Sequence, residues 1–517
     1  MRTACAGLGL LLGVVGCGGT GVVEPDASLP PDAATAAPDA HLDPALVWTP
    51  CGSRECSELS VPVRWSAPQG ARLDLHLEHL PRIAPKAQLW LLQGGPGAAG
   101  AGLGALLDTI ATRAPELELF LPDHRGTGAS GRLSCDDEEA PQSPGGITIT
   151  DEEWPVCVTS LRRRMGDTLA DYSSEAAARD LAALISRFRV AGRPVFIYGV
   201  GYGTTLAHRF LQLDPDGADG VILDSVSWPD RTYLDYDSLW NQAARGWFDL
   251  CGADALCSSK LGVDPWSALD SLERRLADGS HCPEVVDAGL TPPRLEQLLA
   301  ALIADDDTRV AAPALVYRLL RCGPADRDAA MHALRWQEAQ QGADASFSPV
   351  LARNILLSEL GLTDPAMDPV LERAAESCLA CPGVGVGLRA RTEAWPRYPF
   401  PERLRTWAVT EVPLLQLAGG LDPLAPAARL MASGSAEHFT AQGQSIIIFP
   451  HATQSAVDST PTRTPGAPDC GLGLLLQFVV APRAPLDRGC LADLTAPDFT
   501  GTSIAPVILG TPDAWED

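Results

Sequence analysis

The sequence predicts an α/β fold, in which a mostly parallel sheet is flanked by helices and carries an inserted, mainly helical cap. Three observations support this prediction. Apolar runs typical of buried strands alternate with helical segments over residues 46–227. Residues 228–405 then read as mostly helical, without that alternation, and the strand–helix pattern resumes over 406–517. The folded part therefore divides into a first core segment (46–227), a helical cap (228–405) and a C-terminal core segment (406–517).

Length and charge agree with one enlarged domain that has no polyanionic partner. A chain of 517 residues exceeds one ordinary core, so an insertion is expected. Its 65 acidic and 39 basic residues give a formal net charge of −26. Such a chain is repelled by nucleic acid and by anionic lipid surfaces, which excludes both as direct partners. We expect a monomer with no cofactor and no bound metal.

The first residues predict a targeting segment. Met1–Thr3 carries a positive charge, and the apolar stretch Leu8–Val15 is too short to span a bilayer. Val14–Cys17 matches a lipoprotein signal box, so residues 1–17 are predicted to be a signal peptide that ends at a lipidated Cys17. An ordinary secretory signal is the alternative. Residues 18–45 read as a flexible linker. These features predict a protein of the cell envelope, lipid-anchored at the outer membrane or in the periplasm, or a secreted one, which touches a membrane only through its anchor.

Cysteine usage predicts an oxidising compartment. Without Cys5 and Cys17, twelve cysteines remain, an even number as a disulfide framework requires. Cys378 and Cys381 could instead form half a zinc site or a redox pair, but no second C-x-x-C and no nearby histidine pair accompanies them. Proximity in the sequence suggests the pairs Cys51–Cys56, Cys135–Cys157, Cys251–Cys257, Cys282–Cys322, Cys378–Cys381 and Cys470–Cys490.

The most informative residue is Gly201. Pro194–Val200 reads as a short apolar strand, followed by the turn Gly199–Gly203 and the start of a helix. This is the layout of the nucleophile elbow G-x-S-x-G of α/β-hydrolases, in which small residues two before and two after the nucleophile allow strand and helix to pack tightly. Gly201 stands at the position of the serine, so the scaffold is present and the attacking hydroxyl is absent.

Other parts of a hydrolase site follow in the order that this fold uses. An apolar strand ends in the turn Gly94–Gly97, where Gly94 or Gly95 would offer one oxyanion N–H, and Tyr202 would offer the second. Asp422 ends a later strand as the candidate acid, and His451 follows the next strand as the candidate base.

Together these motifs resemble the proline iminopeptidase and tripeptidyl aminopeptidase group of α/β-hydrolases, in its secreted bacterial branch with a TAP-like C-terminal region. The resemblance rests on Gly94–Gly97, Asp123–Gly128, Gly199–Gly203 and Leu421–Pro423, and covers roughly residues 45 to 505. It implies a serine peptidase scaffold whose cap roofs the pocket, and a small peptide or acyl ligand. The chain departs from the family at Gly201 and around His451, where Pro450 and Ala452 replace the usual glycines.

These observations predict an aminopeptidase-like scaffold that is catalytically impaired and binds peptide or acyl ligands. The alternative is an active peptide or ester hydrolase that uses another nucleophile, such as Ser225 or Thr204, or a water activated by Asp422 and His451. The sequence also predicts that Gly201→Ser would restore hydrolysis.

Overall fold

The computed structural model describes residues 47–232, 235–340, 344–361, 370, 377–385 and 388–516. The predicted signal peptide (1–17), Cys17 itself and the predicted linker (18–45) lie outside these residues.

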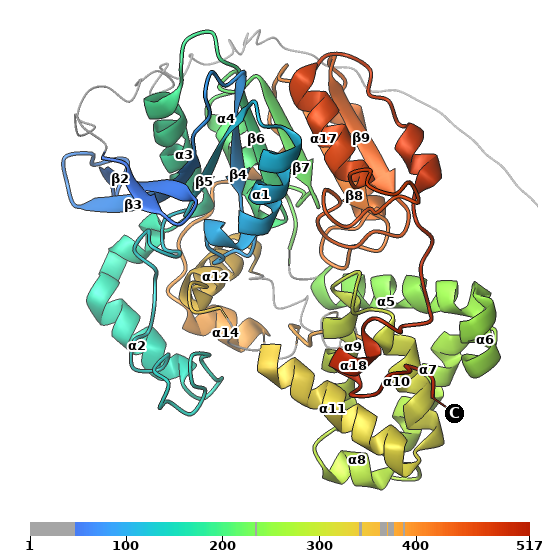
Figure 1. The fold of residues 1–517 in the computed structure, drawn as a ribbon. Helices are drawn as coiled ribbons and strands as arrows, with labels where there is room; N and C mark the ends of the chain where they lie inside the picture. The colour runs from blue at the N-terminus through green and yellow to red at the C-terminus, as the bar shows by residue number, and fades with distance from the viewer. Residues whose placement is uncertain are drawn as a thin grey trace, which may run out of the picture. The chain divides into compact units, whose positions relative to one another are not determined.

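Nine strands and a larger set of helices make up the described chain (Figure 1). The strands are β1 (Thr49–Cys51), β2 (Arg54–Pro62), β3 (Arg72–Leu80), β4 (Ala87–Leu92), β5 (Leu117–Pro122), β6 (Val195–Val200), β7 (Gly220–Asp224), β8 (Leu414–Gly419) and β9 (Gln444–Phe449). The longer helices are α1 (Gly104–Arg113), α2 (Trp154–Met165), α3 (Ser174–Phe188), α4 (Tyr202–Leu213), α5 (Tyr236–Ala253), α7 (Pro265–Ala277), α9 (Pro292–Ile303), α10 (Ala311–Arg321), α11 (Pro324–Gln340) and α17 (Cys470–Val480). The short helical segments are η1 (Gly100–Leu103), η2 (Gly166–Asp171), α6 (Ala255–Leu261), α8 (Pro283–Asp287), α12 (Pro349–Ile355), η4 (Leu356–Leu360), α14 (Leu388–Ala394), η6 (Glu402–Arg405), α15 (Ala427–Ala432), α16 (Ser435–His438), η7 (Gly489–Asp493) and α18 (Ala505–Ile508).

All nine strands form one sheet, in the order β1-β2-β3-β5-β4-β6-β7-β8-β9. β1, β2 and β3 pair antiparallel, and β3 also pairs antiparallel with β5. Every pairing from β5 through β4 to β9 is parallel. β4, β6, β7 and β8 are buried along their whole length, as parallel strands covered on both faces require. The predicted α/β-hydrolase fold class is confirmed.

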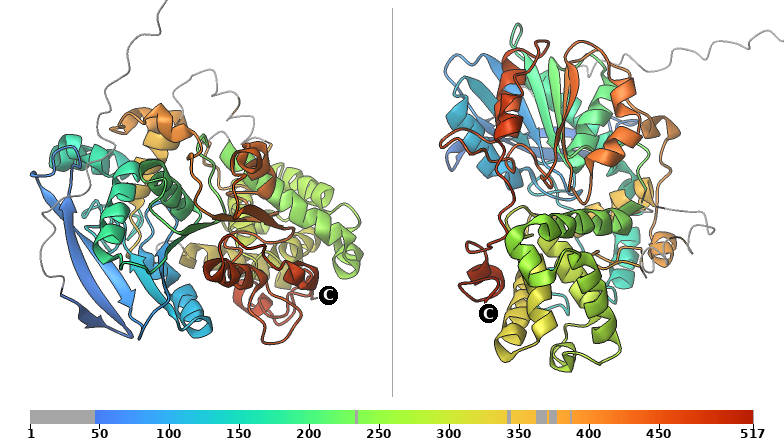
Figure 2. Two further views of the ribbon diagram at one scale, coloured as in Figure 1. Left: turned by 90° about the horizontal axis from the view of Figure 1, so that it is seen from above. Right: turned by 90° about the vertical axis from the view of Figure 1, so that its right-hand side faces the viewer.

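Helices cover both faces of this sheet, which Figure 2 shows from above. α3 and α4 pack in one apolar cluster with one face of the strands, and α1 and α17 pack in another cluster with the opposite face. α3 is amphipathic, since Leu181, Leu184 and Ile185 are buried on one side. The helix begins after Ser173, whose hydroxyl accepts a hydrogen bond from the Ala176 N–H.

The cap helices α5 to α11 bury an apolar core of their own. The C-terminal residues join that core, although the sequence placed them in the segment 406–517 of the sheet domain. Trp515 is buried among the cap helices and donates from Nε1 to the Phe499 carbonyl, and Arg318 of α10 donates to the Ala514 carbonyl. α12, η4 and α14 pack instead against α2, in a separate cluster. Short apolar segments far apart in the chain give no local signal of such partners.

The six disulfides join the pairs expected from the sequence, Cys378–Cys381 included. Their Cα–Cα distances run from 5.2 Å to 6.1 Å, within the range that a disulfide spans. A framework of this density fits a secreted or extracytoplasmic protein. In the part of the chain that the structure describes, no helix is both long enough and apolar enough to cross a membrane.

The cap contains a buried carboxyl group that makes its stability depend on pH. Burial raises the pKa of Glu273 on α7 to about 9, with the charges of Glu296 and Asp270 as smaller causes. Oε1 of Glu273 has no hydrogen-bond partner among the described residues. An unfolded glutamate titrates near 4.5, so the stability that the protonated group contributes is fully present below pH 4.5 and is lost as the pH rises toward 9.

We therefore expect Glu273→Gln to stabilise the protein at pH 8 and to leave it almost unchanged at pH 4. One pKa unit corresponds to about 1.4 kcal/mol, so relief of even part of the shift gives a gain of ~1–3 kcal/mol at pH 8. Thermal unfolding at the two pH values measures this difference. Glu152→Gln, at an exposed position, is the matched control. An equal effect of Glu273→Gln at both pH values would contradict the prediction.

Candidate functional site

The turn between β6 and α4 is built around Gly201. Its backbone has φ 54° and ψ −117°, in the positive-φ region that favours glycine. The Gly201 N–H donates to the Asp224 carbonyl (2.9 Å), and the Gly201 carbonyl accepts from the Thr204 N–H (3.1 Å). Gly201 thus lies on a sharp strand-to-helix elbow, at the C-terminal end of a central strand.

The two flanking glycines are required by close packing. A Cβ on Gly199 would overlap the Gly203 carbonyl, and a Cβ on Gly203 would overlap the Leu92 carbonyl at the end of β4. Only glycine fits at either position, which is the role that the elbow pattern predicts for them.

Two backbone N–H groups beside the elbow have no hydrogen-bond partner among the described residues. They belong to Tyr202, the first residue of α4, and to Gly95, and both residues line one cavity with Gly201. The Gly94 N–H donates instead to Oε1 of the Gln93 side chain (2.8 Å). Of the two glycines that the sequence offers as oxyanion donors, Gly95 is therefore the one with a free N–H.

Asp422 is buried just after β8. Its Oδ1 accepts from the backbone N–H groups of Leu424 (2.8 Å) and Ala425 (2.9 Å), and its carboxylate also bonds the Ser225 hydroxyl. Oδ2 is buried and has no hydrogen-bond partner among the described residues. Burial raises the pKa of Asp422, and its hydrogen bonds oppose that shift.

His451 follows β9, but its ring makes no hydrogen bond to Asp422 or to any other described residue. Its carbonyl accepts a hydrogen bond from the Arg309 guanidinium. Burial, and secondarily the Arg309 charge, lowers the pKa of the His451 ring. His451 lines a second groove of about 570 Å³, which includes Asp306 and Asp458 but not Gly201. Gln454 lines both this groove and the cavity that holds Gly201.

Gln454, which the sequence analysis did not single out, is the residue that lies against the elbow. A Cβ built on Gly201 would lie 2.6 Å from the Gln454 Nε2. The Gln454 amide has no hydrogen-bond partner among the described residues, and the next residue, Ser455, donates its N–H to the Ser225 hydroxyl that also bonds Asp422. The loop after β9 thus brings Gln454 to Gly201. No motif marks this glutamine in the sequence, because only the path of the loop places it there.

The cavity that holds Gly201 measures about 70 Å³, enough for a small polar group or a few waters. Its lining includes Gly95, Gly201, Tyr202 and Gln454. The rest of the wall is mostly apolar and includes Trp228, Ile355, Leu356, Phe400 and Leu424. Its charged lining residues are Arg209, Arg231 and Glu359, two cations and one anion.

Arg209 and Glu359 are both buried in this wall. The Arg209 guanidinium donates to the Leu404 carbonyl and to Oε1 of Gln212 (3.0 Å), while its Nε has no hydrogen-bond partner among the described residues. Burial lowers the pKa of Arg209. Glu359 accepts hydrogen bonds from the Ser174 N–H (2.8 Å), from the Ser174 hydroxyl (2.6 Å) and from the Tyr398 hydroxyl (2.7 Å).

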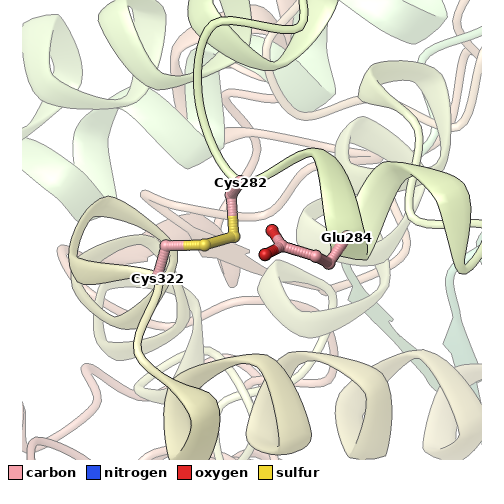
Figure 3. Close-up of side chains that lie close together, drawn as sticks. All are labelled: Cys282, Glu284 and Cys322. Atoms are coloured by element: carbon pink, nitrogen blue, oxygen red, sulfur yellow. A yellow bond between two sulfur atoms is a disulfide. The ribbon is translucent and has the colours of Figure 1, made fainter.

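One group of side chains in the described chain has the spacing of metal ligands, namely Cys282, Glu284 and Cys322. Figure 3 shows that the two sulfur atoms are bonded to each other as a disulfide. A disulfide offers no thiolate, which is the form that binds a metal. This group therefore does not form a metal centre.

The parallel sheet, the glycine elbow after β6 and the buried carboxylate after β8 define an α/β-hydrolase scaffold. Over 219 residues the chain is 26% identical to the tripeptidyl aminopeptidases of Streptomyces coelicolor and Streptomyces lividans. The aligned part covers 39% of this chain and 39% and 40% of those two proteins, so it spans well under half of their length. No family model matches the chain.

Solved structures of esterases are also similar to this chain at low identity. A thermophilic esterase from Thermogutta terrifontis is 13% identical with a TM-score of 0.30, over 77% of this chain and 90% of that one. Acetyl xylan esterase 1 from a Thermoanaerobacterium species is 13% identical with a TM-score of 0.34, over 86% of this chain and 89% of that one.

Proposed function

We propose that this protein is a catalytically impaired α/β-hydrolase with an aminopeptidase-like scaffold, which binds peptide or acyl ligands instead of cleaving them. One observation carries the proposal: the elbow bears Gly201 where a serine hydrolase has its nucleophile, and the Gln454 amide lies beside it. Without a nucleophile that acts together with its base, the rate of such a hydrolase falls by about 10⁶. An amide cannot accept a proton near neutral pH, so Gln454 supplies no base.

The hydroxyl groups of Thr204 and Ser225, the substitute nucleophiles suggested by the sequence, already form hydrogen bonds within the fold. The Thr204 hydroxyl donates to the Gly201 carbonyl (2.6 Å) and accepts from the Ser227 N–H (3.0 Å). Ser225 is buried, and its hydroxyl accepts the Ser455 N–H (2.9 Å) while it bonds Asp422. Neither hydroxyl makes a hydrogen bond to a histidine ring among the residues that the structure describes, which argues against the alternative of an active hydrolase.

The proposal also includes a place for the protein at the cell envelope, anchored through a lipid on Cys17. The Val14–Cys17 signal box supports the anchor, and the six disulfides support an oxidising compartment.

A fluorophosphonate probe tests the proposal, because it modifies activated serines in any position of the pocket. We expect no labelling of the folded protein and no turnover of aminoacyl or short peptidyl chromogenic substrates above the buffer rate. A fluorophosphonate-reactive family serine hydrolase, assayed in parallel, controls for probe quality. Labelling of Ser225 or Thr204, located by mass spectrometry, would overturn the proposal in favour of an active hydrolase.

A further inference from the structure

The cavity at the elbow presents hydrogen-bond donors where a hydrolase presents its nucleophile and base. The N–H groups of Gly95 and Tyr202 have no partner among the described residues. The Gln454 Nε2 lies 2.6 Å from the place of a Gly201 Cβ and likewise has no partner among them. Because Gly201 has no side chain, the Gln454 amide can approach the elbow this closely, and all three groups line the same cavity.

The cavity wall contains a buried arginine with an unused donor. Arg209 and Glu359 both lie in this wall, and the second cation, Arg231, interacts with the carboxylate of the buried Asp422. Arg209 is only 3% exposed, and its buried Nε has no hydrogen-bond partner among the described residues. The Glu359 carboxylate accepts three hydrogen bonds, two from Ser174 and one from the Tyr398 hydroxyl. The N-terminus of the twelve-residue helix α4, which begins at Tyr202, adds a partial positive charge.

We propose that this cavity binds the free carboxylate of a short acyl or peptidyl acid. The inference rests on the proposed function, since it names the class of ligand that the same catalytically impaired site would bind. The N–H groups of Gly95 and Tyr202 and the amide of Gln454 donate to the carboxylate oxygens, and Arg209 balances their charge. The acyl or peptidyl chain lies along the apolar wall of Ile355, Leu356 and Phe400.

The chemistry distinguishes an acid from a neutral analogue. An ionised carboxylate only accepts hydrogen bonds, so it matches a set of donors, and its bonds are about twice as strong as those of neutral groups. A primary amide of the same shape brings two N–H donors of its own, which would face the donors of the site. The site therefore suits the acid product of a hydrolytic reaction better than its amide substrate.

Calorimetric titration of the full chain at pH 7 tests the proposal with matched pairs of ligands. Hexanoate is compared with hexanamide, and N-acetyl-dialanine with its C-terminal amide. We expect each acid to bind at least about 10-fold more tightly than its amide, which is about 1.4 kcal/mol. The acid that binds more tightly identifies the source of the carboxylate, an acyl chain or a peptide. If neither acid is preferred over its amide, the proposal is overturned without the need for any variant.

Variants locate the binding. Gln454→Glu replaces the amide by a carboxylate of the same size, so we expect acid binding to weaken at least 10-fold. Gln442→Glu makes the same change in charge at an exposed position and should leave binding unaltered. Acid binding by Gln454→Glu at the wild-type affinity would contradict the assignment. The titration measures binding and not cleavage, so a negative result here leaves the proposed loss of catalysis intact, whereas labelling of a serine overturns that proposal whichever ligand binds.

Discussion

The double variant Gly201→Ser, Gln454→His is expected to hydrolyse aminoacyl and short peptidyl chromogenic substrates at least about 10³-fold faster than the wild-type chain. A histidine at position 454 would accept the proton of the new serine, because the side chain of residue 454 lies against position 201. That side chain must shift to make room, since Gln454 Nε2 lies only 2.6 Å from the place of the serine Cβ. The unpaired, buried Oδ2 of Asp422 is available to orient the ring, as the acid of a triad does. Initial rates with a panel of p-nitroanilides and p-nitrophenyl esters measure the gain.

Gly201→Ser alone is expected to show no hydrolysis. This revises the expectation from the sequence that this one change would restore activity. Its Cβ would crowd the Gln454 amide, and an amide cannot act as the base. Adding Asp422→Asn to the double variant should abolish the gain. If the single variant instead turns over substrate and loses that activity on His451→Ala, then His451 is the base and our assignment of position 454 is incorrect.

Replacing Asp180 by Ala is expected to lower the free energy of unfolding by about 3–5 kcal/mol, because it leaves the Arg125 charge buried and unpaired. Arg125 is buried, and its Nε donates to Oδ2 of Asp180 (2.6 Å). Nη1 of Arg125 also donates to the carbonyl of Val63 (2.7 Å), just after β2, and to that of Asp171 (2.7 Å) in η2, so the ion pair links both segments to α3. Urea unfolding followed by circular dichroism measures the loss.

The neighbouring pair on the same helix provides the control. Arg179 and Glu175 form a partly exposed ion pair at the i, i+4 spacing of α3. Surface pairs contribute about 0–1 kcal/mol, so Arg179→Ala should change stability little. If Asp180→Ala cost no more than Arg179→Ala, the buried pair would not have the structural role assigned to it.

Features encoded by neighbouring residues could be read from the sequence. The apolar strands β6 and β8, the capped amphipathic helix α3 and the Gly199–Gly203 elbow each depend on local periodicity or turn chemistry. The disulfide pairs were also accessible, because three of the six join cysteines no more than six residues apart and the even number of cysteines indicated complete pairing.

Tertiary structure alone decided which atoms meet. The hydrogen bond of the Gly94 N–H to the Gln93 side chain leaves Gly95 as the free donor, and nothing in the glycine-rich motif distinguishes the two. Trp515 is likewise buried among cap helices that lie far from it in the sequence. The hydrogen bond from Arg318 to the neighbouring Ala514 spans 196 residues.

The position of the catalytic base shows most clearly the difference between what the sequence determines and what the tertiary structure decides. The order nucleophile, acid, histidine directs attention to His451, since histidine is the residue type that catalysis needs. The loop after β9 is held instead by hydrogen bonds from the Ala456 and Val457 N–H groups to the Asp224 carboxylate. Those bonds to a different strand set the path of the loop, and that path carries Gln454 to Gly201. The sequence by itself determined the elbow and the glycine at its centre, because both lie within one local motif, whereas the residue beside Gly201 was decided by long-range hydrogen bonds that no local pattern records.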